Sequence, residues 1–140
     1  STKNIKMVSL LDIARLSDVV AIHVHLNKNT EGLINNTFFN NMKTTATIIN
    51  TARGKIIKEK ALLDALLNKK IAGAGLDVID GEWLNKKERE KHPLIKFAKK
   101  NDNLLITPHI GGSTIESVQH SRIFMAKKIV SFLNNSSKKE

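Results

Sequence analysis

Four short apolar segments run through the chain, each rich in β-branched residues and bounded by polar residues or glycine. They are DVVAIHVHL (18–26), TATIIN (45–50), IAGAGLDVI (71–79) and NLLIT (103–107). Their apolar residues are nearly continuous instead of alternating, which is typical of strands covered on both faces, as in a parallel sheet. We therefore predict four parallel strands, with a weaker fifth in IKMVS (5–9).

Helical patterns lie between the predicted strands. Ser9 precedes LLDIARLS, and Asp12 stands three residues after it, as in a capping box. Asn35 or Asn36 begins a second pattern in NTFFNNMK. In KEKALLDALLNKK (58–70), leucine and alanine recur on one stripe and lysines gather at the C-terminal end, where they suit the helix dipole. We predict three helices from these patterns.

The C-terminal part contains one long helical pattern and one ambiguous stretch. Ser113 and Glu116 form a second S-x-x-E box, which predicts a helix from there to about Leu133. The ambiguous stretch, GEWLNKKEREKHPLIKFAKKND (81–102), predicts a loop and a short helix that ends near His92–Pro93.

The alternation of strands and helices predicts an α/β fold with a parallel, doubly wound sheet. A chain of 140 residues is one domain long. We expect that domain to span residues 1–133, including the C-terminal helix, and a polar tail to follow at 134–140. In such sheets ligands bind at the carboxyl ends of the strands, so that edge is the place to look for chemistry.

Composition narrows the class of protein. Apolar residues make up 41% of the chain and charged residues 26%, as in ordinary globular proteins. No apolar stretch approaches the ~20 residues that a membrane span needs, and the N-terminus lacks the order of a signal peptide. The absence of cysteine excludes disulfides and thiolate metal sites. We expect a soluble, cytoplasmic protein without a membrane partner.

The formal net charge of +10 raises the question of nucleic acid. The lysines are scattered instead of gathered on one face. Five Phe and one Trp offer few aromatic rings on which nucleic-acid bases could stack. An anionic small-molecule partner is therefore favoured over nucleic acid.

Polar residues follow each predicted strand where it ends. They are His23 and His25 in the first segment, Thr51, Arg53 and Gly54 after the second, Asp77 and Glu82 at the third, and His109 after the fourth. Because the carboxyl ends of parallel strands meet at one edge of a sheet, an arginine, two carboxylates and a histidine could converge there.

Each of these residues also has an ordinary explanation. Arg53 could be a surface arginine at a turn, and the two carboxylates could be a helix cap and a solvated acid. His23 and His25 are two residues apart, so they would share one face of a strand and could bind a metal. No third ligand accompanies them, and we expect no metal site. His92 and His120 are interpreted as surface residues.

Three separated motifs carry a family resemblance. They are INTARGKIIKEKALLDALLNKKIAGAGLDVIDGEW, then HPL, then NLLITPHIGGST, with SDVVAIHVHLNKNTEGLIN leading into them. In this order they resemble the NAD-dependent D-isomer-specific 2-hydroxyacid dehydrogenases, the family that contains D-3-phosphoglycerate dehydrogenase. The resemblance implies a Rossmann-type domain and hydride transfer between NAD(H) and a 2-hydroxy or 2-keto acid, with 3-phosphoglycerate among the candidates.

The resemblance also implies roles for three catalytic residues. Arg53 would hold the carboxylate and carbonyl of the substrate, which suits a planar guanidinium that never loses its charge. His109 would be the general acid/base on the C2 hydroxyl, since histidine ordinarily titrates near neutral pH. Glu82 would pair with that imidazole, fix its tautomer and stabilise the imidazolium.

The same resemblance implies a cofactor site for NAD. Its residues would be Val24, Thr51, Ala52, Arg53, Asp77, His109, Gly111 and Gly112. The first three would line the cofactor through backbone groups, Asp77 would hold the nicotinamide end, and the turn from His109 to Gly112 would close over it.

One part of the family pattern is missing. The family binds the pyrophosphate of NAD at a G-x-G-x-x-G turn, and this sequence contains none; Gly73 and Gly75 are interpreted as tight packing within a strand. We therefore expect the C-terminal half of a Rossmann-type NAD-binding domain, without the first βαβ phosphate-binding unit. The chain also departs from the family at His25, Lys58 and Trp83, where Pro, an acidic residue and Pro are common.

Two functional interpretations stay open. In the first, the chain is a piece of a dehydrogenase that a missing N-terminal half completes, and its small-molecule partner is a 2-hydroxy acid. In the second, it is a non-catalytic half-Rossmann unit that pairs with a partner chain or with a second copy as a homo-oligomer. Pairing is expected because a half sheet exposes an unpaired edge and apolar helix faces.

Overall fold

The computed structural model describes residues 5–81 and 85–136. The chain divides into two compact units, Ser1–Pro108 and His109–Glu140. We describe each by itself. The predicted division into 1–133 and 134–140 stays a prediction.

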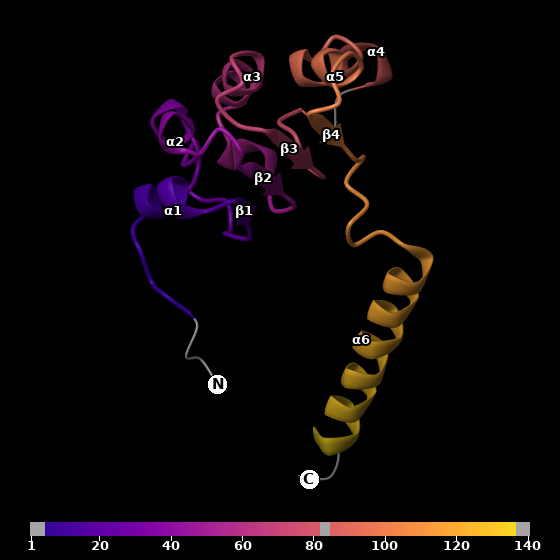
Figure 1. The fold of residues 1–140 in the computed structure, drawn as a ribbon. Coiled ribbons are helices and arrows are strands. Elements are labelled where there is room, and N and C mark those ends of the chain that lie inside the picture. Colours follow the sequence, from indigo (N-terminus) through magenta and orange to yellow (C-terminus); the bar gives the residue numbers. More distant parts are fainter. Residues whose placement is uncertain (1–4, 82–84, 137–140) are drawn as a thin grey trace. The chain divides into compact units, whose positions relative to one another are not determined.

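The first unit is built on one parallel sheet with the strand order β1-β2-β3-β4 (Figure 1). The strands are β1 (Val19–Ile22), β2 (Thr47–Asn50), β3 (Gly73–Leu76) and β4 (Leu104–Ile106). All three neighbouring pairs are parallel, for example Asn50 with Leu76 in register. The predicted α/β fold with a parallel sheet is confirmed, and each strand lies inside a predicted apolar segment.

The weaker fifth strand predicted at 5–9 does not form. These residues are exposed and have no regular structure, so their apolar side chains gain no burial from pairing with the sheet. Coverage on both faces is wrong for the edge strand β1, whereas successive residues of β3 are buried. Residues of β1 alternate between exposed and buried, with Val19 63% exposed and Val20 7% exposed.

Helices connect the strands and supply the covering layer. They are α1 (Leu10–Leu16), α2 (Asn36–Asn41), the 3-10 helix η1 (Gly54–Ile56), α3 (Glu59–Leu67), α4 (Lys86–Arg89) and α5 (Pro93–Ala98). Figure 1 shows α2, α3 and α5 on the same side of the sheet. One layer of helices therefore covers one face of the sheet in this unit.

The core lies between that helical layer and the sheet. Phe38 and Phe39 of α2 pack edge to face, with ring centroids 6.3 Å apart, and both are buried. Leu62 and Leu66 of α3 and Ile48 of β2 are buried with them. Each such side chain contributes ~1.5–3 kcal/mol by leaving water, which holds the strands in register and so fixes their carboxyl ends.

The helix starts follow the local sequence. Ser9 accepts a hydrogen bond from the backbone N–H of Asp12, and its hydroxyl donates to the Asp12 carboxylate, so the predicted helix cap at Ser9 is confirmed. Asn35 caps α2 by accepting from the N–H groups of Thr37 and Phe38. The second helix in the ambiguous stretch was not predicted: Pro93 begins α5 instead of ending a helix, because proline at the first helical position loses no hydrogen bond.

The second unit contains α6 (Ile115–Ser136). The predicted cap at Ser113 is wrong by one residue, because the Thr114 hydroxyl accepts from the backbone N–H of Ser117. Large apolar side chains of α6, such as Phe124 and Met125, are more than half exposed. Among the described residues, no helix combines the length and apolar character that crossing a membrane requires.

Candidate active site at the carboxyl edge of the sheet

Asn50, the last residue of β2, shapes the loop that follows it. Its side chain is buried, with only 1% exposed. The Asn50 Oδ1 accepts from the backbone N–H of Ala52 at 3.0 Å, and its Nδ2 donates to the carbonyl of Arg53 at 2.9 Å. The buried side-chain amide thus fixes the backbone of residues 51–53, which we call the Arg53 loop. The sequence reading missed this residue, although a polar residue that closes the apolar run TIIN was the available signal.

Gly54 brings the Arg53 loop against the loop after β3. A Cβ atom placed on Gly54 would lie 2.2 Å from the carbonyl carbon of Ile79 and 2.4 Å from the nitrogen of Asp80. Both are backbone atoms, so no side chain can move aside to make room. Only glycine lets these two loops touch.

Asp77 ties the ends of three strands together. It is buried, and its backbone N–H donates to the carbonyl of Asn50 at 2.9 Å. The Thr107 hydroxyl donates to its Oδ1 at 2.5 Å, and the Thr107 N–H donates to the carbonyl of Leu76 at 2.9 Å. Polar residues at the carboxyl ends of β2, β3 and β4 therefore meet at one edge of the first unit, through Asn50, Asp77 and Thr107. The predicted convergence of Arg53, Glu82 and His109 at this edge stays a prediction.

Arg53 presents its guanidinium from this edge. The residue is exposed, and its Nη1 donates to the carbonyl of Ala52 at 2.6 Å. Thr51 is also exposed, Ala52 is half-buried, and Val24, two residues after β1, is 43% exposed. Backbone groups and the Arg53 cation are therefore accessible at the carboxyl edge of the sheet, on a loop whose backbone Asn50 fixes.

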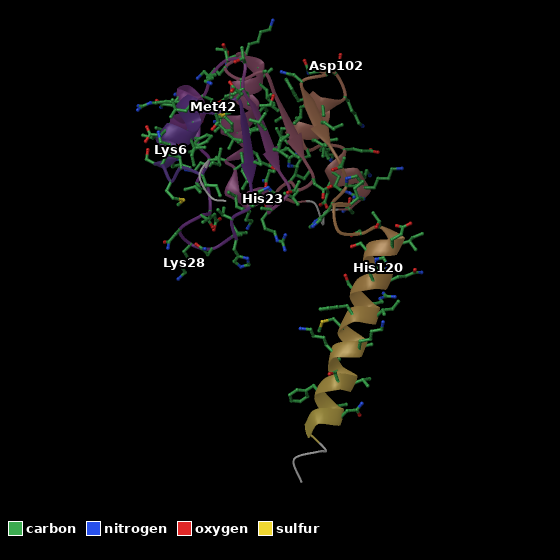
Figure 2. All side chains as sticks on the ribbon, turned by 60° about the horizontal axis from the view of Figure 1, so that its bottom comes forward. Lys6, His23, Lys28, Met42, Asp102 and His120 are labelled. Atoms are coloured by element: carbon green, nitrogen blue, oxygen red, sulfur yellow. The ribbon has the colours of Figure 1, made fainter. Side chains whose placement is uncertain are left out.

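The two histidines after β1 do not share a strand face. The strand ends at Ile22, so His23 and His25 both lie beyond it, and both are exposed; Figure 2 labels His23. Across the part of the chain that the structure describes, no three His, Cys, Asp or Glu side chains form a group that could hold a metal ion.

A half-buried acid–histidine pair, Glu59 and His92, lies beside the Arg53 loop and was missed. Glu59 Oε1 accepts from the Asp80 N–H at 2.8 Å, and Glu59 Oε2 lies 3.1 Å from His92 Nε2. That same His92 nitrogen is 3.1 Å from the carbonyl oxygen of Asp80. The side chain of His92 is only 10% exposed, so its interpretation as a surface residue is wrong.

The environment of Glu59 changes its acidity. Burial raises its pKa above the usual value, because the carboxylate loses water. The hydrogen bond from Asp80 and the neighbouring His92 oppose that rise, and the Asp80 charge adds to it.

The other predicted site residues fall at the start of the second unit or outside the described residues. His109, two residues after Thr107, has a left-handed backbone with φ 56° and is half-buried. The turn after it is closed by a bond from the Ser113 N–H to the carbonyl of Ile110 at 3.1 Å. A Cβ atom on Gly112 would meet no described atom within 4 Å. Glu82 lies outside the described residues.

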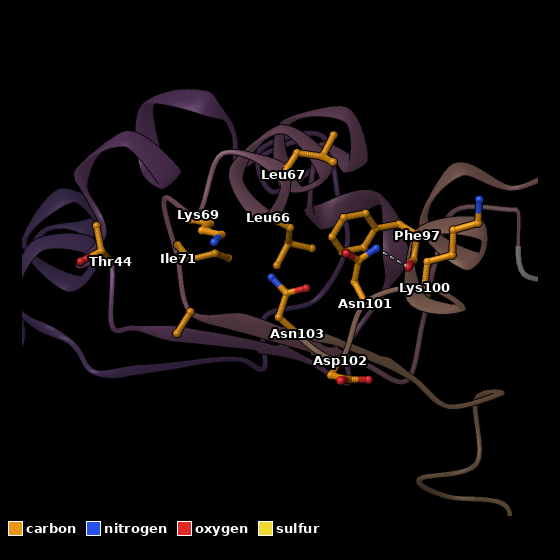
Figure 3. Close-up of a pocket in the computed structure, with 11 residues that line it drawn as sticks. Thr44, Leu66, Leu67, Lys69, Ile71, Phe97, Lys100, Asn101, Asp102 and Asn103 are labelled. Carbon is orange, nitrogen blue, oxygen red and sulfur yellow. Dashed lines mark hydrogen bonds between the residues drawn. The ribbon is translucent and has the colours of Figure 1, made fainter.

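A separate hollow opens at the opposite, amino edge of the sheet (Figure 3). Leu66, Ile71 and Phe97 give it apolar walls, and Lys69 and Lys100 are among its polar residues. Because open α/β sheets bind ligands at the carboxyl ends of their strands, this hollow is not the candidate cofactor site.

Comparison with known proteins identifies the family. The family model described as "D-isomer specific 2-hydroxyacid dehydrogenase, NAD binding domain" matches residues 1–111. This range contains the Arg53 loop, Asp77 and His109. The chain belongs to the D-isomer specific 2-hydroxyacid dehydrogenase family, within its NAD binding domain.

Individual relatives agree with this assignment. The chain is 41% identical over 130 residues to a glyoxylate reductase of Thermofilum pendens, covering 93% of this chain and 36% of that protein. It is 37% identical over 128 residues to D-3-phosphoglycerate dehydrogenase of Escherichia coli, covering 91% and 30%. The structure of D-lactate dehydrogenase with NAD+ from Lactobacillus jensenii matches with a TM-score of 0.81 at 29% identity, covering 91% and 40%. The chain thus spans about a third of the length of the curated relatives it matches.

Proposed function

We propose that this chain supplies the C-terminal half of the cofactor domain in an NAD-dependent oxidoreductase of the D-2-hydroxyacid dehydrogenase type. The reaction is hydride transfer between NAD(H) and a 2-hydroxy or 2-keto acid, with 3-phosphoglycerate among the candidates. The observation that carries the proposal is the family match over residues 1–111, which contains Arg53 and His109. The proposed location is the cytoplasm, because the cofactor and the acid are both water-soluble metabolites.

Arg53 binds the carboxylate of the acid in this proposal. Two features support that role: the guanidinium is exposed, and Asn50 fixes the backbone from which it projects. A guanidinium can donate two parallel hydrogen bonds to a carboxylate, which orients the acid as well as holding it.

His109 moves the proton at the C2 oxygen, and Glu82 orients its imidazole. The left-handed backbone of His109 supports a functional role, since non-glycine residues adopt this conformation rarely and often at functional sites. A carboxylate beside the imidazole stabilises the imidazolium that forms when the proton arrives.

The residues present fit the nicotinamide end of the cofactor. In the first unit, the buried Asp77 carboxylate is an acceptor suited to the nicotinamide amide, and Val24, Thr51 and Ala52 would offer backbone groups to the cofactor. In the second unit, a Cβ atom on Gly112 would meet no described atom within 4 Å, which suits close approach of a ligand to the backbone of Gly111 and Gly112. When bound, the cofactor supplies or accepts the hydride. The pyrophosphate end would need a G-x-G-x-x-G turn from another segment, since these 140 residues contain none.

The test is a binding titration with NADH in the presence of oxalate, a carboxylate that is not reduced. Fluorescence of Trp83, the single tryptophan, is the readout. We expect oxalate to strengthen NADH binding, and Arg53→Gln to remove that strengthening. An unchanged effect of oxalate in Arg53→Gln contradicts the role of Arg53.

The non-catalytic alternative rests on a different observation. β1 is an edge strand of the sheet, and its Val19 side chain is 63% exposed. An unpaired edge with apolar side chains favours pairing with an N-terminal half, another chain or a second copy. Sedimentation of the purified chain tests self-pairing, which a monomer at all concentrations contradicts.

A further inference from the structure

The Glu59 carboxylate connects three segments of the first unit. It belongs to the first turn of α3, it accepts from the Asp80 N–H after β3, and it faces His92, the residue just before α5. Both backbone polar groups of Asp80 are engaged: the N–H by Glu59 and the carbonyl by His92. We name Glu59, Asp80 and His92 the backbone clip.

The geometry defines which imidazole nitrogen carries the proton. His92 Nε2 lies 3.1 Å from two oxygen atoms, Glu59 Oε2 and the Asp80 carbonyl, both of which are acceptors. Nε2 is therefore the donor. His92 Nδ1 is buried and has no hydrogen-bond partner among the described residues. The ring is thus held through one nitrogen only.

The clip meets the Arg53 loop at the Asp80 nitrogen. The Asp80 nitrogen that donates to Glu59 is the atom 2.4 Å from the position of a Cβ on Gly54. From Gly54 the chain runs through η1 directly into α3, which carries Glu59. The Arg53 loop is therefore supported from the core by Asn50 and from the adjacent loop by the clip.

We propose that Glu59 and His92 are positioning residues for Arg53: by holding the Asp80 backbone against Gly54, they fix the base from which the guanidinium meets the carboxylate of the acid. The consequence for binding rests on the proposed function. The consequence for the loop does not, because it concerns contacts within the first unit alone.

The first measurement is amide hydrogen exchange on the ¹⁵N-labelled full chain. The Asp80 amide donates to Glu59, and the Ile57 amide donates to the carbonyl of Gly54 at 3.0 Å. In Glu59→Ala we expect both amides to exchange roughly tenfold faster, while the Ala72 amide at the amino edge keeps its rate. Glu59→Gln keeps an acceptor for Asp80 and should restore most of the protection. Asp64→Ala, which removes an exposed charge from the same helix, is the matched control and should change neither amide.

The second measurement is oxalate binding with NADH present. Glu59→Ala should weaken oxalate binding roughly tenfold, and Glu59→Gln, which keeps an acceptor for the Asp80 N–H, should recover most of that loss. If Glu59→Ala fails to fold, His92→Phe keeps an aromatic ring but lacks the Nε2 donor and should give the same two changes.

The outcomes separate the two claims. Unchanged exchange at both Asp80 and Ile57 in folded Glu59→Ala overturns the positioning role. Faster exchange with unchanged oxalate affinity also overturns it, because the loop would then move without consequence for Arg53. If the unmodified chain binds no oxalate, the proposed function fails while the exchange data still decide whether the clip holds the loop.

Discussion

The side-chain amide of Asn50 donates to the backbone carbonyl of Arg53 at 2.9 Å, so the exposed guanidinium stands on a loop held from inside the core. The same side chain accepts from the Ala52 N–H. One buried polar residue thereby fixes the backbone conformation of the loop that follows β2. The stability of the domain and the position of its cation depend on the same two hydrogen bonds.

Asn50→Ala should destabilise the chain by about 2 kcal/mol. The substitution removes two hydrogen bonds and leaves the Ala52 N–H and the Arg53 carbonyl without their partner. Urea denaturation measures the loss. Asn68→Ala removes a comparable bond, from Asn68 Nδ2 to the Asp64 carbonyl, at an exposed site and should cost less than about 0.5 kcal/mol. Equal losses in the two variants would contradict the importance of burial.

Gly54→Ala should destabilise the chain by about 3 kcal/mol or more. Its Cβ would lie 2.2 Å from a backbone carbon of Ile79, so one of the two loops has to move. Gly112→Ala is the control, because a Cβ there meets no described atom within 4 Å, and its effect should stay within about 0.5 kcal/mol. Thermal or urea unfolding compares the two, and a well-tolerated alanine at Gly54 would contradict the close packing of the loops.

Lys58→Asp should stabilise the chain by about 1 kcal/mol. Lys58 is the N-cap of α3 and makes no side-chain capping bond, whereas an aspartate can accept from the free N–H groups of the first turn and favours the helix dipole. Lys58→Ala separates this effect from the loss of a positive charge and should lack the gain. If both variants are equally stable, capping is not the cause.

The stability that Glu59 contributes should depend on pH with a defined sign. Its pKa in the fold is raised above 4.5, so the folded state favours the protonated carboxyl. That contribution is complete below pH 4.5 and is lost as the pH rises through the raised pKa. The chain should therefore lose stability relative to Glu59→Gln as the pH rises from 4.5 through the raised pKa, as measured by urea denaturation at each pH. If the unmodified chain instead becomes more stable than Glu59→Gln over that range, the charge of His92 and the hydrogen bond from the Asp80 N–H outweigh the effect of burial on the pKa of Glu59.

Local patterns predicted much of the fold, and long-range contacts account for what they missed. The strand segments and the Ser9 cap follow from residues close together in sequence. The cap of α6 fell on Thr114 instead of Ser113 because two adjacent hydroxyls satisfy the same pattern. Pro93 was read as a stop because a proline both ends and begins helices.

In the candidate site, too, local patterns predicted some residues and long-range contacts explain those that were missed. Arg53 and Asp77 could be placed at one edge because parallel strands have their carboxyl ends on the same side, whereas Thr107 falls within the fourth predicted strand segment. The burial of His92 depends on Glu59 and on the Asp80 backbone, which belong to other segments, so no local pattern indicates it. Asn50 was missed because its partners are backbone atoms, which the sequence does not distinguish.

The most direct test of the proposed function is to map NADH on the chain by ¹⁵N chemical shifts at millimolar cofactor. The account predicts that the largest shifts gather at the carboxyl edge, on the amides of Val24, Thr51, Ala52 and Asp77. Shifts centred instead on Lys69 and Lys100 at the amino edge, or no shifts at any amide, would contradict it.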